Sequence, residues 1–148
     1  MLTENLRVLF RRDLNRVTQE IQLYQDEQKI WHVERGIANS AGNLCLHLIG
    51  NLNTYIGLEL GGVAYTRHRD LEFSLKDVPR QELLEKLAET STIVDAALSQ
   101  VTPEVLAQEY PVLVFDHKTS TEYFLVHLSS HLSYHLGQIN YHRRLLDA

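Results

Sequence analysis

The chain has 148 residues, of which 44% are hydrophobic and 22% charged, a composition typical of a globular domain rather than a disordered segment. A net charge of −5, without a basic patch interleaved with aromatic residues, argues against nucleic-acid binding. The single cysteine, Cys45, excludes an internal disulfide and suits a reducing compartment, and no uncharged apolar stretch approaches the ~18 residues of a membrane span. We therefore expect one cytoplasmic domain over residues 1–148 with no membrane segment.

The first helix is predicted over residues 2–24, where apolar side chains recur at three- and four-residue steps. Thr3 fits the N-cap position, since its hydroxyl can accept a hydrogen bond from a free backbone amide. Residues 31–42 follow with the glycine, asparagine and serine content of a turn. We therefore expect a loop between the first and second helices.

A second helix is predicted over residues 40–58, and His47 lies beside its apolar stripe. Asn43 and Asn51 stand one turn before and after His47, so the three side chains form a polar seam. A metal ion with its surrounding hydrogen bonds would supply the partners that such a seam needs if it is buried. An exposed helix edge explains the seam equally well, and spacing alone does not decide. Cys45 points about 160° away from His47 and is expected to be an inert buried thiol.

The longest stretch without helical periodicity covers residues 60–78, and a loop of this length in a compact domain is often functional. His68 lies within it between two arginines, which disfavour a further cation, so it is not expected to be a ligand. A third helix is predicted over residues 79–100 and serves as scaffold. The Thr-Pro-Glu sequence at 102–104 suits a short helical turn with Thr102 as its N-cap, and residues 110–115 are expected to be extended.

The last helix is predicted from Thr119 to Leu146, with Thr119 as the N-cap of a capping box. This helix carries His127, His131 and His135 at four-residue spacing. Successive members of such a series drift by only about 40° around the helix axis, so all three share one stripe. The stripe faces a core, because it also carries apolar residues. These are Phe124, Leu128, Leu132 and Ile139.

Three histidines on a core-facing stripe indicate a metal site. Neutral imidazole is the commonest protein metal ligand, and a pair at i and i+4 can bind one ion. Spacing alone does not choose between the His127–His131 pair and the His131–His135 pair. Four predicted helices make an all-α bundle, where metal sites are built from facing helices, and His47 suits the facing position. The alternative is a bundle with a polar histidine core and no metal.

Three segments of the chain resemble the DinB-like superfamily of metal-binding four-helix bundles. Residues 127–139 are similar to its closing signature, in which two histidines four apart precede a residue, often arginine, and then Gly-Gln. Residues 43–51 are similar to the second-helix segment that holds the first metal histidine of the superfamily. Residues 67–73 resemble the Arg-x-Arg-Asp-x-Glu-Phe stretch of the DUF1572 branch. The resemblance extends over nearly the whole chain in helix order and length.

The resemblance implies an all-α fold, a four-helix bundle of DinB-like type with a long loop between the second and third helices. It also implies a homodimer and one divalent ion bound by three residues: His47, His131 and His135. Zinc is the first expectation for three histidine ligands, and nickel is close behind. His127 then becomes a neighbour one turn away from the ligands. Leu136 departs from the signature, since many relatives have arginine there, and Gly137 is expected where two helices approach closely.

Three neutral imidazoles leave open positions on a divalent ion, which is typical of catalytic rather than structural sites. The resemblance implies a metal-dependent thiol S-transferase or hydrolase that acts on a small molecule. We expect four polar residues to orient that substrate: Asn51, Arg67, Tyr134 and Gln138. The alternative function is a non-catalytic metal-binding or stress-related bundle, in which a fourth protein ligand would close the site.

Overall fold

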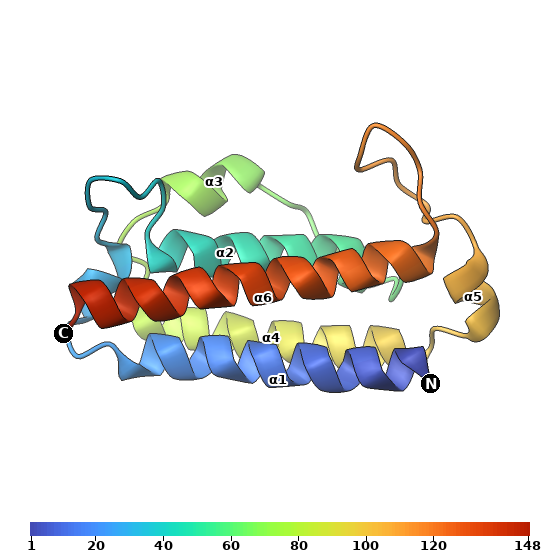
Figure 1. The fold of residues 1–148 in the computed structure, drawn as a ribbon, viewed down its shortest axis with the longest axis horizontal. Helices are drawn as coiled ribbons and strands as arrows, with labels where there is room; N and C mark the ends of the chain where they lie inside the picture. Colours follow the sequence, from blue (N-terminus) through green and yellow to red (C-terminus); the bar gives the residue numbers. More distant parts are fainter.

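The structure is a computed structural model that describes all residues, 1–148, and it is helical throughout, without a β-strand. Four long helices lie side by side in Figure 1: α1 (Leu2–Leu23), α2 (Ala41–Leu52), α4 (Arg80–Ser99) and α6 (Thr121–Leu146). Two short helices, α3 (Arg69–Ser74) and α5 (Pro103–Ala107), lie in the connections. None of the helices is both long and apolar enough to cross a bilayer.

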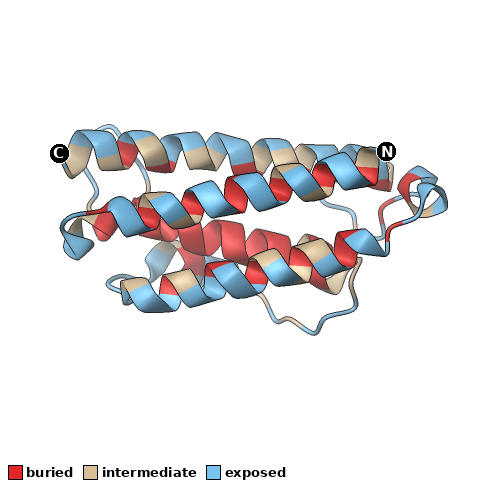
Figure 2. Cartoon of the chain, turned by 90° about the horizontal axis from the view of Figure 1, so that it is seen from below, coloured by how far each residue is buried: buried red, intermediate tan, exposed pale blue.

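The helix α2 forms the centre of the structure, and every one of its residues is buried. In Figure 2 it is the helix that is red along its whole length. A helix with apolar residues on all sides is a core helix, and α2 contacts α3, α4 and α6 around its circumference. Its polar seam of Asn43, His47 and Asn51 is therefore buried rather than an exposed edge, so these side chains need partners inside the protein.

Two short non-α segments flank α2. A 3₁₀ helix over Glu27–Trp31 precedes the loop that leads to it, and a π-helical segment over Asn53–Leu58 extends its C-terminal end. Ser40 is the N-cap of α2, and its hydroxyl accepts a hydrogen bond from the Asn43 amide at 3.1 Å. The predicted extent of the second helix, residues 40–58, is thus confirmed, although its last six residues are π-helical.

The sequence predicts a loop over residues 60–78, but this segment contains the helix α3. The Asn43 side-chain amide donates hydrogen bonds to the carbonyls of Glu72 at 2.9 Å and Leu75 at 2.8 Å. These bonds attach α3 to α2, and Figure 1 shows α3 lying over α2 on the side away from α1 and α4. A six-residue helix is too short to be stable alone or to show a clear period, so tertiary contacts decide its formation.

Two of the three predicted N-caps are wrong. Thr3 lies within α1, where its buried hydroxyl has no hydrogen-bond partner, and Met1 occupies the cap position. The last helix is capped by Ser120 rather than Thr119, and the Ser120 hydroxyl accepts from the Tyr123 amide at 3.1 Å. The predicted cap of the short helix is confirmed, because the Thr102 hydroxyl accepts from a backbone amide at 3.2 Å.

The predicted extended segment at residues 110–115 forms no strand. The only β-type pairing is an isolated bridge between Glu109 and Ser120 just outside it. The Tyr110 amide donates to the Thr119 carbonyl at 2.8 Å, which brings the two ends of this connection together at the start of α6. Residues 111–118 consequently form a loop that rises above the N-terminal end of α6 in Figure 1.

The thiol of Cys45 should be unreactive in the native protein. It is fully buried on α2, and burial raises its pKa to about 12, so almost no thiolate exists near neutral pH. We expect no reaction with Ellman's reagent at pH 8 over a time in which guanidinium-unfolded protein reacts completely. Rapid native labelling would contradict the burial of α2.

Candidate metal centre

Three histidine side chains from two facing helices converge at one point. His47 comes from α2, and His131 and His135 come from successive turns of α6. The Nε2 atom of His131 lies 3.2 Å from Nε2 of His47 and 3.1 Å from Nε2 of His135. The potential ligand atoms of all three lie within 4.8 Å of one another. Spacing alone does not choose between the His127–His131 pair and the His131–His135 pair. The structure brings His131 together with His135.

The spacing of these nitrogens fits a single divalent ion. Two nitrogen ligands at a Zn–N distance of about 2.05 Å in tetrahedral geometry lie about 3.3 Å apart. The observed separations of 3.1 and 3.2 Å are close to this value. Burial, followed by the nearby His135 and His47, lowers the pKa of His131 to about 4, and burial also lowers the pKa of His135. Neutral imidazoles with free lone pairs are the form that binds metal.

A hydrogen bond to Glu72 fixes the tautomer of His47. The Nδ1 atom of His47 lies 3.0 Å from Oε1 of Glu72. An ionised carboxylate can only accept, so Nδ1 carries the proton and Nε2 presents its lone pair to the centre. Arg67 holds the same carboxylate through two bonds, from Nε at 2.9 Å and from Nη2 at 3.0 Å. Burial alone would raise the pKa of Glu72, but the bonds from His47 and Arg67 outweigh it and lower the pKa.

Gly50 makes room for this carboxylate. A Cβ atom added at Gly50 would overlap the Glu72 carboxylate and approach Nε of Arg67 to 3.3 Å. The neighbouring atoms belong to a buried ion pair, in which the Glu72 side chain is only 7% exposed, so they cannot move aside into solvent. The absence of a side chain on α2 at this point therefore lets α3 bring Glu72 against His47.

The other two rings differ in their outer partners. Nδ1 of His135 lies 2.7 Å from Oε1 of Gln138, which can only accept, so His135 also presents a bare Nε2 to the centre. Nδ1 of His131 is buried without a partner, as is Oδ1 of Asn51 on the facing helix. The lone pairs of His47 and His135 both point at Nε2 of His131. A proton on this Nε2 can form a hydrogen bond to only one of the two rings, so the other nitrogen–nitrogen contact is left without a proton. A cation at the centre would satisfy all three nitrogens, and the residues present fit one.

A family model described as "Protein of unknown function (DUF1572)" matches residues 3–148. The chain belongs to the DUF1572 family. The match includes all three histidines, Glu72 and Gly50, and it agrees with the resemblance of residues 67–73 to that branch. A comparison with curated proteins gives no match.

The remaining predicted residues of this DUF1572 protein lie around the cluster at different distances. Arg67 contacts the cluster through Glu72, and Gln138 contacts it through His135, so both side chains hold the histidine rings in place rather than facing the centre. His127 is half-buried and packs against Phe115, with ring centroids 4.9 Å apart. Tyr134 is 66% exposed and lines a groove between α1 and α6.

The sequence pattern does not single out Glu72 or Gly50 as site residues of the DUF1572 chain. Glu72 lies in the motif at residues 67–73, and this motif is the sequence signal that could have identified Glu72 as a site residue. The expectation for Gly137 is wrong, because a Cβ there would have no atom within 4 Å and no helix approaches it. The glycine that permits a close approach is Gly50.

Gly50→Ala should lower zinc affinity by about 10- to 100-fold, because it displaces the carboxylate that orients His47. Competition with a chromophoric chelator measures this affinity, with circular dichroism to verify the fold. Gly137→Ala is the matched control, since it adds the same methyl group in open space. It should keep full affinity and stabilise α6 by about 0.5–1 kcal/mol. Equal affinity in the two folded variants would contradict the role of Gly50.

The free energy of unfolding of the metal-free protein should fall as the pH falls from 7 to 5. The pKa of His131 is about 4 in the folded chain against an ordinary 6.5, so the unfolded state binds more protons across this range. Stability therefore rises with pH here. Urea denaturation in a chelating buffer measures the change, which His131→Gln should reduce. The same loss in wild type and variant would exclude His131 as its source.

Proposed function

We propose that this protein is a metal-dependent enzyme of the DinB-like superfamily, a four-helix bundle that binds one divalent ion through His47, His131 and His135. The observation that carries the proposal is the convergence of three Nε2 atoms, two of them on rings whose Nδ1 protons are held by Glu72 and Gln138. Zinc and nickel are the preferred ions, since both suit imidazole nitrogen ligands.

The donor set supports a catalytic rather than a structural ion. The cluster offers three protein nitrogens, and the nearest carboxylate, Glu72, bonds to the outer nitrogen of His47 instead of facing the centre. A structural zinc site is closed by four protein ligands, whereas a catalytic site leaves a position for water or substrate. This argues against the alternative of a purely structural metal bundle.

Two reaction classes fit such a centre, transfer of a small-molecule thiol to an electrophile and hydrolysis. The ion, when bound, would bind and activate a thiolate or lower the pKa of water to about 7. The protein supplies no thiol, because its single cysteine, Cys45, is fully buried with a pKa of about 12. A transferase reaction would therefore need a low-molecular-weight thiol as a second substrate.

The residues around the ligands preserve one protonation state for either reaction. Arg67 keeps Glu72 ionised, and Glu72 keeps the proton of His47 on the outer nitrogen. Gln138 does the same for His135. The rings are thereby held with their inner nitrogens free before any substrate arrives, which is the preorganisation that a catalytic site needs.

Metal analysis of untagged protein tests the proposal, with about one ion per chain as the expected result. His131→Ala should abolish stoichiometric binding, because His131 is central to both short nitrogen contacts. His117→Ala is the control, since His117 is exposed and bonds only to its neighbour Asp116. Equal metal content in the two variants would refute the site.

Activity is then measured by screening thiols with electrophiles, and ester or amide substrates, against metal-loaded and metal-free protein. Turnover that requires the ion and disappears in His47→Ala would support an enzyme. No metal binding, together with no change in melting temperature on adding zinc or nickel, would favour the polar histidine core and remove the basis for an enzyme.

A further inference from the structure

We propose that the cavity between the loop at residues 34–39 and the C-terminal half of α6 binds the organic substrate, a small molecule with an apolar body and one anionic group. Its role as a substrate site rests on the proposed function, whereas its capacity to bind such a molecule does not. The cavity has a volume of about 500 Å³. This lies within the range of about 300–1,000 Å³ found for small-molecule sites.

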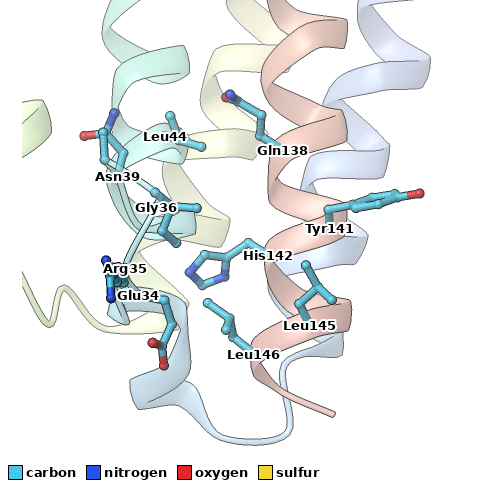
Figure 3. A pocket seen from close by; sticks show the side chains of 12 residues that line it. Glu34, Arg35, Gly36, Asn39, Leu44, Gln138, Tyr141, His142, Leu145 and Leu146 are labelled. Carbon is cyan, nitrogen blue, oxygen red and sulfur yellow. The ribbon is translucent and has the colours of Figure 1, made fainter.

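The cavity begins one helical turn from the histidine cluster. Its lining includes Leu44, one turn before His47 on α2, and Gln138, one turn after His135 on α6. In Figure 3 these two side chains lie at one end of the pocket, with Glu34 and Leu146 at the other. Oε1 of Gln138 accepts the bond from Nδ1 of His135, so one side chain both lines the cavity and holds a predicted metal ligand.

The body of the cavity is apolar. Its hydrophobic lining comes from the loop, α2 and α6: Ile37, Ala38, Leu44, Tyr141, Leu145 and Leu146. His142 also faces it (Figure 3), but both of its ring nitrogens are already bonded. Nδ1 lies 2.6 Å from the Tyr24 hydroxyl and Nε2 lies 2.8 Å from the His32 carbonyl. The ring therefore offers a ligand its carbon surface rather than a free hydrogen-bonding group.

The rim of the cavity carries one anionic and one cationic side chain, Glu34 and Arg35, and only the cation is free to pair with a ligand. Glu34 is engaged by His32, whose Nε2 lies 2.7 Å from Oε1 of Glu34. Arg35 has no acidic partner and makes no side-chain hydrogen bond within the chain. The amide nitrogen of Gln138 is likewise free to donate, because only its oxygen is used by His135. The cavity lining thus includes unused donor groups, one of them cationic, beside an apolar body.

The dye 8-anilinonaphthalene-1-sulfonate has this chemistry, an aromatic body with one sulfonate, and its fluorescence rises in apolar sites. We expect saturable binding to the folded, metal-free protein at one site per chain. Leu145→Glu places a negative charge on the apolar wall and should weaken binding by about tenfold. Arg35→Gln should weaken it several-fold by removing the rim cation.

Val126→Glu is the matched control, because Val126 is also an exposed apolar residue of α6 but lies in the groove against α1. It should leave the dye affinity within about twofold of wild type, since it lies outside the cavity. Weakening by Val126→Glu but not by Leu145→Glu would place the dye in that groove and overturn the proposal. No saturable binding to the folded protein would also overturn it.

Separate measurements of metal binding and of dye binding distinguish a failure of this proposal from a failure of the proposed metal centre. Metal binding without dye binding would support the metal centre and contradict the proposed ligand cavity. Dye binding without metal binding would support the cavity and contradict the metal centre. When both occur, zinc should tighten dye binding, because a bound His135 fixes Gln138 at the cavity wall. Gln138→Leu should remove this coupling while the cavity remains apolar. A zinc effect of the same size in Gln138→Leu would exclude Gln138 as the link.

Discussion

The hydrogen bond between His47 and Glu72 is the interaction on which the candidate site depends. It exists because α2 is buried on all sides, so that a histidine on this helix must find its partner inside the protein. Glu72 reaches His47 only because Asn43 attaches α3 to α2 and Gly50 leaves space for the carboxylate. Arg67 then balances its charge.

The chemistry of the centre follows from the protons that this arrangement assigns. An acceptor faces the outer nitrogen of His47 and of His135, so the inner nitrogens of both rings are bare, and His131 lies between them. Burial keeps His131 neutral near physiological pH by lowering its pKa to about 4. The protein therefore maintains closely spaced lone pairs at a partly buried centre. These lone pairs would repel one another without a cation bound between them.

The sequence predicts the four long helices and the grouping of the three histidines, because helical periodicity and four-residue spacing indicate which residues share a face. It does not reveal α3, since six residues show no clear period and their position depends on hydrogen bonds from Asn43, about 30 residues earlier. Gly50 and Gly137 also show that the sequence does not reveal contacts between distant segments. Both are helical glycines, yet only Gly50 has a close neighbour, and that neighbour comes from a distant segment.

The attachment of α3 has a consequence for how the protein opens. This helix is held against α2 by its bonds to Asn43, by the Glu72 carboxylate and by the Phe73 ring, which packs on His47. A helix of this length does not persist alone. Its backbone amides should therefore exchange with solvent through local detachment rather than global unfolding. An ion that immobilises His47 would slow this detachment, so the exchange rate of α3 reports the occupancy of a site in which α3 contributes no ligand.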